Sequence, residues 1–452
     1  MSARKRLRPA AKTLPQAMRD FLTPEVFKQV RKAASRRKRP RWDVHPLLYI
    51  LLLMTWCAGD SLPEKFEVAR GFYIVCCVKR KRPGRTFAGF EKAMSKLPMP
   101  VLRALADALR GRISAIFGER LLYRGFIPLG CDGTRQACPR TEELEQRLGT
   151  FGKKDSCDAA PMIWNTSIVH LTLGIPWCWR FGRGSKASER MHLIQMLPLL
   201  PKLALIVTDA GYVGYNVVRA LAEANVCFLL RMSSNATFYT EDQQPLSDWR
   251  EGLVYYWPQK YRDAGQPPIR GRLIRITSPS RKVDVWLLTN VFDQQRLSTE
   301  FAGQLYRWRW ESEGFFRTYK RTLQKIKLES RTLRLIHREA EASMIATQLL
   351  LCQGALAIRS NTRQPTSAET IPVMCSPRGV LLEIRRELRA AVPRRDFTRR
   401  LTQAVRERRW RTTSKEKRKW PRRKPHEPPK PPKILMLTDQ LKSQIKQHLN
   451  AA

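Results

Sequence analysis

A set of short, almost wholly apolar runs that end at charged residues constrains the fold of this chain most strongly. The runs span residues 126–131, 203–207 and 226–230. The charged residues that close them are Asp132, Asp209 and Arg231. Runs of this length are typical of buried strands, and helical spacing at 189–200 and 211–224 separates them. The pattern predicts a mixed α/β sheet with both aspartates at the carboxyl ends of central strands.

The rest of the chain divides around this pattern. Residues 162–173 and 175–181 read as two more strands joined at a glycine, and helical spacing returns after residue 299. Residues 233–298 are polar and β-rich, and we expect an insertion there rather than a continuation of the sheet. The predicted segments are a helical basic region at 1–118, the first part of the core at 119–232, the β-rich insertion at 233–298, the second part of the core at 299–360, and C-terminal helices with a basic, proline-rich tail at 361–452.

An excess of positive charge identifies the class of partner. Lys and Arg total 84 against 39 Asp and Glu, which gives a formal net charge of +45. Hydrophobic residues make up 43% of the chain, so global disorder is excluded. A basic run at 36–41 and another at 79–85 flank apolar helical segments. Either run alone fits a solvated face, but together with the net charge they favour contact with DNA.

The apolar runs indicate the cellular compartment, and the cysteines and histidines limit the kind of metal site. The longest apolar run, 46–58, is shorter than the roughly 20 residues that span a bilayer, and no apolar signal core follows the basic N-terminus. We therefore expect a cytoplasmic protein. The ten cysteines form no Cys-x-x-Cys pair and the six histidines lie far apart, which argues against zinc. A metal would be held by carboxylates, which favours magnesium or manganese.

One predicted helix, at 305–320, carries a polar stripe. Its members are Tyr306, Arg309, Glu313 and Lys320. At about 100° per residue these four fall within an arc of roughly 60°, which Arg317 joins while Glu311 points away. Such a stripe is also compatible with an ordinary solvated helix face containing an ion pair. The aromatic residues around it favour a wet, functional cleft instead.

Three carboxylates beside a basic stripe suit phosphodiester chemistry. Two divalent ions held by acids activate a water or a 3′-hydroxyl and stabilise the leaving oxygen of an in-line displacement. Neighbouring cations and a phenol hydroxyl hold the flanking phosphates in register. Each aspartate alone is weak evidence, because aspartate often begins a turn after a strand.

These residues resemble a known family. The spacing Tyr306-x2-Arg309-x3-Glu313-x6-Lys320 is similar to the YREK signature of DDE transposases from bacterial insertion sequences, in the insertion-sequence-four family. The segment around Asp132 resembles the first catalytic aspartate region, and Val207–Tyr212 resembles the second. The resemblance covers about 125–355.

The resemblance implies an RNase H-like catalytic core with a β-rich insertion between the second aspartate and the glutamate. By the same resemblance Asp132, Asp209 and Glu313 form the catalytic, metal-binding triad for two Mg²⁺ or Mn²⁺ ions. The residues expected to contact DNA phosphates are Tyr306, Arg309, Arg317, Lys320 and Arg231.

A tryptophan late in the insertion is relevant to the excision route. In family members that excise through a DNA hairpin, such a residue stacks on a flipped base, and Trp286 is similar in context. Trp286 fits equally well as a core residue of a strand. Excision through hairpin ends is therefore a hypothesis.

The leading interpretation is a cut-and-paste transposase, associated with the nucleoid of a bacterium. It would bind the terminal inverted repeats as a homodimer, cleave the DNA and join the 3′-hydroxyl ends to target DNA, with no membrane partner. The N-terminal region would read the repeats and the C-terminal helices would mediate synapsis. Trp410 and Trp420 favour a DNA clamp in the tail. The alternatives are a decayed or domesticated DNA-binding protein without cleavage activity, and a stand-alone RNase H-like nuclease.

Overall fold

The computed structural model describes most of the 452 residues. The described ranges are 11–34, 42–78, 81–151, 160–184, 188–242, 247–277, 284–359, 374–390, 392–405 and 430–450. The basic run at 36–41 and the tail residues Trp410 and Trp420 lie outside them. The chain forms two compact units, each assembled from stretches that are not consecutive in sequence. Unit 1 comprises 1–121, 133–187 and 313–409, and unit 2 comprises 122–132, 188–312 and 410–452.

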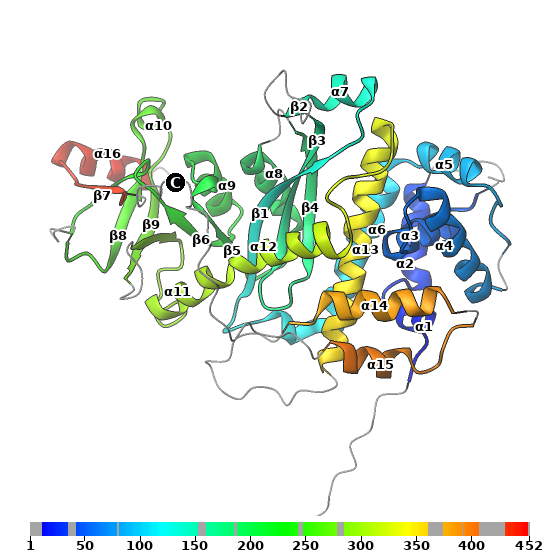
Figure 1. Cartoon of the computed structure of the whole chain (residues 1–452). Helices are drawn as coiled ribbons and strands as arrows, with labels where there is room; N and C mark the ends of the chain where they lie inside the picture. Colours follow the sequence, from blue (N-terminus) through cyan, green and yellow to red (C-terminus); the bar gives the residue numbers. More distant parts are fainter. Residues whose placement is uncertain are drawn as a thin grey trace, which may run out of the picture. The chain divides into compact units, whose positions relative to one another are not determined.

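Unit 1 is mainly helical (Figure 1). Its helices are α1 (Leu14–Arg19), α2 (Pro24–Ala33), α3 (Val44–Trp56), α4 (Leu62–Cys76), α5 (Phe87–Lys96), α6 (Met99–Phe117), η1 (Gly118–Leu121), α7 (Glu142–Leu148), the π-helical turn η4 (Thr318–Thr322), α13 (Leu333–Arg359), α14 (Pro377–Leu388) and α15 (Phe397–Ala404). Its strands are β2 (Thr150–Phe151), β3 (Ala160–His170) and β4 (Pro176–Arg183). The helical N-terminal region expected from the sequence is confirmed.

Capping residues and apolar spacing explain where the N-terminal helices begin. Thr23 accepts a hydrogen bond from the Val26 amide before α2, and Asp43 accepts one from the Val44 amide before α3. Each bond satisfies an amide that the first helical turn leaves without a backbone partner. Helix α3 is apolar over nearly its whole circumference and is buried accordingly.

Helix α13 forms the centre of unit 1. It packs against α3, α6, α14 and β4, and Figure 1 shows it in yellow beside these elements. The Trp56 indole donates to the Ala346 carbonyl across the α3–α13 contact at 3.1 Å. The segment 333–358 is long and apolar enough to cross a membrane, but 89% of its most apolar window is buried inside the protein. It is placed as the core helix of a globular unit.

Unit 2 contains a long sheet and its covering helices. The strands are the first part of β1 (Ile127–Ala137), β5 (Ala204–Thr208), β6 (Cys227–Met232), β7 (Thr237–Thr240), β8 (Glu251–Tyr256), β9 (Ile269–Ile276), β10 (Val285–Thr289) and β11 (Lys433–Met436). The helices are α8 (Glu189–Met196), η2 (Leu197–Leu199), η3 (Ala210–Tyr212), α9 (Tyr215–Glu223), α10 (Gln259–Asp263), α11 (Thr299–Trp308) and α16 (Asp439–Asn450). Helix α12 (Trp310–Arg317) begins in unit 2 and ends in unit 1, as does β1.

The strand order in unit 2 is β11-β7-β8-β9-β10-β6-β5-β1. Strands β1, β5 and β6 are parallel, whereas β10 pairs with β6 in antiparallel orientation, with Leu288 opposite Leu230. The expectation that 233–298 would not continue the sheet is therefore wrong. The stretch is inserted in the sequence, but β10 takes the edge that β6 would otherwise leave with unpaired backbone groups.

The fold class predicted from the sequence is confirmed. Both units combine helices with sheet, and β1 is shared between them. In unit 1 the order runs β4-β3-β1, and in unit 2 it runs β1-β5-β6 before the added strands. This arrangement is consistent with an RNase H-like core. The division of the sequence into five segments stays a prediction.

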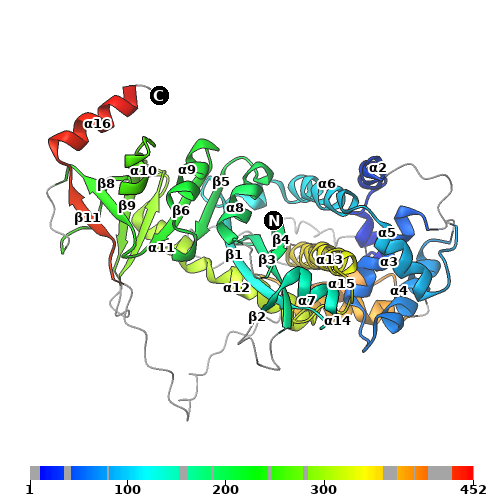
Figure 2. The ribbon, with the colours of Figure 1, turned by 90° about the horizontal axis from the view of Figure 1, so that it is seen from above.

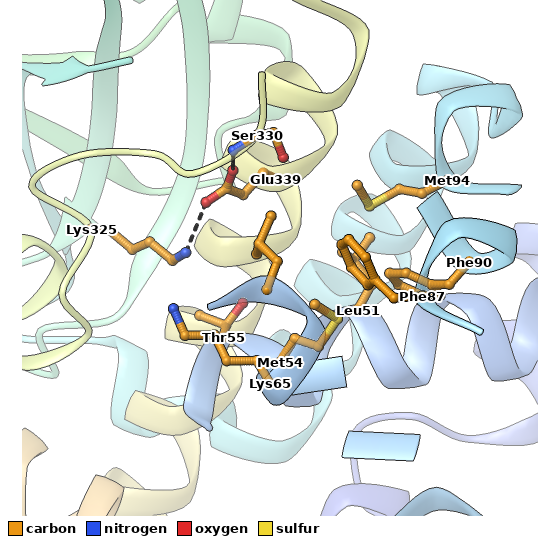
Figure 3. A pocket seen from close by; sticks show the side chains of 11 residues that line it. Leu51, Met54, Thr55, Lys65, Phe87, Phe90, Met94, Lys325, Ser330 and Glu339 are labelled. Carbon is orange, nitrogen blue, oxygen red and sulfur yellow. Dashed lines mark hydrogen bonds and ion pairs between the residues drawn. The ribbon is translucent and has the colours of Figure 1, made fainter. Parts of the chain in front are cut away.

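A buried ion network fixes the segment between η4 and α13 within unit 1. The Lys325 Nζ atom lies 2.9 Å from Oε1 of Glu339, and both side chains are only 7% exposed. Glu339 also accepts the amides of Glu329 and Ser330, at 3.0 and 2.8 Å. Figure 3 shows Lys325, Ser330 and Glu339 on one side of a small pocket, with Phe87, Phe90 and Met94 of α5 on the other. From α4, Lys65 binds Glu329 at 2.6 Å and connects the N-terminal helices to the same segment.

Removing one member of the buried pair should destabilise the protein strongly. We expect Glu339→Gln to lower the free energy of unfolding by about 3–5 kcal/mol, because Lys325 then loses its closest counter-charge in a desolvated site. Urea unfolding measures the change. The matched control is Glu223→Gln, which breaks the exposed Arg219–Glu223 pair on α9 and should have little effect. Equal effects of the two substitutions would contradict the assignment.

The same pair predicts a pH dependence of stability. Burial opposes the charge of Glu339, but Lys325 and the hydrogen bonds from Ser330 outweigh it and lower the pKa of the carboxyl below 4.5. Burial likewise opposes the charge of Lys325, while Glu339 and Glu329 raise the pKa of the amine above 10.5. The Lys325–Glu339 pair should therefore stabilise the fold fully between about pH 4.5 and pH 10.5. Its contribution to the free energy of unfolding should fall as the pH drops below this range or rises above it. The difference in unfolding free energy between wild type and Glu339→Gln, followed against pH, should narrow at both ends.

Candidate active site

Three residues selected from the sequence lie in one row across the parallel strands. The registers pair Gly130 of β1 with Val207 of β5, and Val207 with Leu229 of β6. Two residues beyond each of these positions stand Asp132, Asp209 and Arg231. Neighbouring strands lie about 4.8 Å apart and residues in register face the same side of the sheet, so the three are neighbours. Figure 2 shows β1, β5 and β6 side by side.

The two aspartates differ in their position along the strands. Asp209 directly follows the last residue of β5, as predicted. Asp132 lies in the middle of β1, because that strand continues to Ala137. The expectation that Asp132 ends its strand is therefore wrong, although its register with Asp209 holds. The continuation of β1 arises because its later part is hydrogen-bonded within unit 1, where Ala137 donates to the carbonyl of Ile326 at 3.2 Å.

A tight turn holds Asp209 in place. Its Oδ1 atom accepts the amide of Gly211 at 2.9 Å and so caps the short helix η3. A Cβ atom on Gly211 would lie 3.0 Å from that same oxygen, which is closer than ordinary contact. From α8, the Arg190 Nε atom donates to the carbonyl of Gly211 at 2.9 Å. The turn therefore fixes one oxygen of the Asp209 carboxylate. The carboxylate can keep this position because residue 211 is a glycine and has no Cβ atom.

Two residues to which the sequence assigned no role, Tyr212 and Glu189, belong to this neighbourhood. Tyr212 is 1% exposed, and its burial raises the pKa of the hydroxyl well above 10, with smaller contributions from Cys131, Glu189 and Asp132. Glu189 of α8 therefore lies near the same hydroxyl as Asp132. No short-range motif marked it, because a glutamate after the capping Ser188 reads as an ordinary first-turn residue.

Tyr306 and Arg309 are both buried in unit 2, each 6% exposed. The Arg309 guanidinium lies over the Tyr306 ring at 5.6 Å and over the exposed Trp310 ring at 5.0 Å. Helix α11 is anchored on the segment that precedes β1 through Trp308, whose ring meets that of Tyr123 at 4.9 Å. Spacing correctly predicted that Tyr306 and Arg309 are neighbours. The wet cleft expected around them does not extend to these two side chains in the structure.

The expectation of one uninterrupted helix over 305–320 is wrong. Helix α11 ends at Trp308 and α12 begins at Trp310, with Arg309 between them as the C-cap of α11. Residues 318–322 then form the π-helical turn η4. A π turn holds more residues than an α turn, so the angular phase assumed for Lys320 does not apply beyond residue 317. Tyr306, Arg309, Glu313 and Lys320 therefore do not form a single straight stripe on one helix.

In unit 1, Glu313 and Lys320 are half-buried and Arg317 is exposed. Burial lowers the pKa of the Lys320 amine from 10.5. Next to it, Tyr319 is fully buried, and its hydroxyl lies 2.6 Å from the Ser343 hydroxyl of α13 and 3.2 Å from Nε2 of Gln136. This anchor holds η4 against the core while Lys320 stays partly accessible.

Trp286 lies inside the sheet of unit 2. It is 5% exposed, in β10, opposite Met232 of β6 and Arg275 of β9. The Arg275 guanidinium covers its ring at 5.5 Å and pairs with Asp284 at 2.6 Å. A base can stack on Trp286 only if Arg275 moves from the ring, and the use of this residue as a base platform stays a prediction.

The donors expected for a divalent metal are divided between the units. Asp132 and Asp209 belong to unit 2, and Glu313 belongs to unit 1. Within the described ranges no three His, Cys, Asp or Glu side chains form a group that could hold a metal ion. The two aspartates in one row supply oxygen ligands of the type that hard cations prefer. The donor set therefore fits magnesium or manganese in kind.

The middle of the chain is similar to a known domain. Residues 167–349 match the family model described as Transposase DDE domain. The matched segment includes Asp209, Arg231, Tyr306 and Glu313, and it begins after Asp132. It supports a DDE-type transposase, and with it a DNA-cleaving activity in transposition. The assignment to bacterial insertion sequences of the YREK group stays a prediction.

The other comparisons add little. A search among curated proteins finds no match. Among solved structures, the chain resembles one described as the cryo-EM structure of the piggyBac transposase synaptic complex with hairpin DNA. The identity is 10%, the TM-score is 0.39, and the alignment covers 88% of this chain and 86% of the other. A likeness this distant carries no argument about mechanism.

The turn at Asp209 can be tested with a single methyl group. We expect Gly211→Ala to reduce DNA cleavage while leaving DNA binding intact, because the new Cβ displaces the Asp209 carboxylate. Cleavage rate and duplex affinity are measured on the same preparation. The control is Gly71→Ala in α4, where a Cβ meets nothing within 4 Å. That change should raise the free energy of unfolding by about 0.5–1 kcal/mol and leave cleavage unchanged.

Proposed function

We propose that this protein is a cut-and-paste DNA transposase of the YREK group of bacterial insertion sequences. The observation that carries the proposal is the row of Asp132, Asp209 and Arg231 at one edge of the parallel sheet, in a chain whose residues 167–349 match a transposase DDE domain. It would bind the terminal inverted repeats of its element as a homodimer and join the 3′-hydroxyl ends to target DNA. Its place of action would be the nucleoid of a bacterial cytoplasm.

The row combines the carboxylates and the positive charge that cleavage of a DNA strand requires. Asp132 and Asp209 supply oxygen donors, and Arg231 stands beside Asp209 on the next strand. Carboxylates alone would repel a phosphodiester, so a guanidinium in the same row offsets that repulsion and can hold a phosphate through two parallel hydrogen bonds. Glu313 would complete the triad in the active assembly. Tyr306, Arg309, Arg317 and Lys320 would contact phosphates near the cleaved end.

A divalent metal is implied by this set of acids. Asp132, Asp209 and Glu313 would hold two Mg²⁺ or Mn²⁺ ions. When bound, such ions lower the pKa of a water and stabilise the leaving oxygen in phosphodiester hydrolysis. A phosphate beside the half-buried Lys320 would raise the pKa of its amine, because the anion offsets the desolvation that lowers it.

The proposal is tested with a supercoiled plasmid that carries the reading frame between its flanking inverted repeats. Purified wild-type protein with magnesium or manganese should release the excised element. Asp209→Asn and Glu313→Gln should reduce excision at least 10³-fold, since each removes a charged donor that the reaction requires. Both variants should retain duplex affinity, measured by gel shift.

The matched control is Glu311→Gln, on the same helix as Glu313 but outside the signature. It should excise at close to the wild-type rate. Free nicks without joined products would indicate a stand-alone nuclease, and binding without cleavage by all the proteins would indicate a decayed or domesticated copy. Hairpin ends on the excised element would support the hairpin route, and open 3′-hydroxyl ends alone would reject it.

A further inference from the structure

Helices α14 and α15 form a tightly packed pair on the surface of unit 1, drawn in orange in Figure 1. Gly379 of α14 faces the end of α15, and a Cβ atom there would collide with the carbonyl of Ala404. Phe397 and Leu401 of α15 are buried. The Lys12 amide donates to the Thr398 hydroxyl at 2.9 Å and joins the pair to the N-terminal segment. The pair is therefore a rigid element of the unit.

Charge is distributed unevenly between the two faces of this pair. Residues 376–405 contain eight arginines and three carboxylates. Glu383 is 4% exposed and Glu387 is fully buried, and both pair with Arg400. Glu383 also binds Arg386, whose side chain stays 65% exposed. Oε2 of Glu387 also accepts the amide of Arg394 at 3.0 Å. Most of the negative charge is thus used internally to hold α15 on α14.

The outer face keeps the positive charge. The exposed arginines of residues 376–405 lie on α14, at its C-cap, in the connection to α15 and on α15: Arg378, Arg386, Arg389, Arg394, Arg395 and Arg399. Arg378 and Arg386 of α14 and Arg389 at its C-cap stand at offsets of 0, 8 and 11 residues, which places them within an arc of about 80° over roughly 16 Å of helix. The exposed carboxylate nearest in sequence, Asp396, is partly covered and pairs with Arg399 and Arg400. We call these six residues the arginine face.

We propose that the arginine face binds the phosphate backbone of duplex DNA outside the terminal repeats, without reading its sequence. Guanidinium groups form charge-assisted hydrogen bonds to phosphates, and three of them along one helix stripe can follow a strand. A protein partner is disfavoured, because the centres of protein interfaces are depleted of charge. The exposed apolar residues on α14 and just after it are limited to Leu382 and Val392, among those described.

This inference rests on the proposed function only in taking DNA as the ligand. It assigns α14 and α15 a role that differs from the synapsis expected for the C-terminal helices. Contacts to phosphates hold a duplex in position and contribute affinity that depends on salt, but they carry no sequence information. The surface therefore fits flanking or target DNA.

The experiment compares two triple variants of the full chain. One carries Arg378→Gln, Arg386→Gln and Arg389→Gln, and the other carries lysine at the same positions. Binding to a 30-base-pair duplex of unrelated sequence, and to one carrying the terminal repeat, is measured from low to moderate salt. The glutamine variant should reduce the slope of log affinity against log salt by about 3, equally on both duplexes, because each lost phosphate contact removes about 0.9. The lysine variant should keep the wild-type slope.

The outcomes separate this inference from the proposed function. An unchanged slope for the glutamine variant would overturn it, and so would a loss confined to the repeat duplex. Loss of dimer assembly with an unchanged slope would identify a protein interface instead. If the triple variant fails to fold, as shown by its thermal unfolding, Arg389→Gln alone should reduce the slope by about 1. A reduced slope in a protein that does not excise DNA would leave the inference standing while the proposed function fails.

Discussion

The parallel hydrogen bonding of β1, β5 and β6 determines which side chains meet at the candidate active site. Its register brings Asp132 and Asp209 into one row, although 76 residues separate them in the chain. The same register adds Arg231 to the row. A shift of one residue in either pairing would turn a member of the row to the opposite face of the sheet. Strand β5 is buried along its whole length, so the side chains on both of its faces are packed in this register and any other register would have to repack them.

Unit 1 depends on buried charge in a comparable way. Lys325 and Glu339 stabilise the fold only as a pair, since either charge alone would be desolvated without compensation. The pair fixes the chain between η4 and α13, and Tyr319 fixes η4 itself through Gln136 and Ser343. Glu313 and Lys320 therefore lie on a segment that is anchored just beyond them. Such anchoring limits the movement of side chains that have to meet a scissile phosphate.

The distribution of charge follows one rule in several places. Acidic side chains are turned inward and paired, as Glu339, Glu383 and Glu387 show, while many arginines stay at the surface. A chain with a formal net charge of +45 gains little from exposed carboxylates if its partner is a polyanion. Internal pairing satisfies the acids and leaves the surface potential positive. Composition alone indicates DNA as a partner. The structure adds a candidate surface for it, the arginine face on α14 and α15.

Much of the fold and part of the candidate site follow from the sequence itself. Apolar runs, helical spacing and the position of Asp209 are local properties, because burial on one or both faces of an element imposes its own period on the residues. The tertiary structure decided what depends on partners distant in the chain. Strand pairing placed Arg231 beside Asp209, joined β10 to β6, and covered Trp286 with Arg275. The break between α11 and α12 at Arg309 and the π-helical turn η4 did not follow from the sequence either, because helical spacing records which face of a segment is buried and does not distinguish an α turn from a π turn.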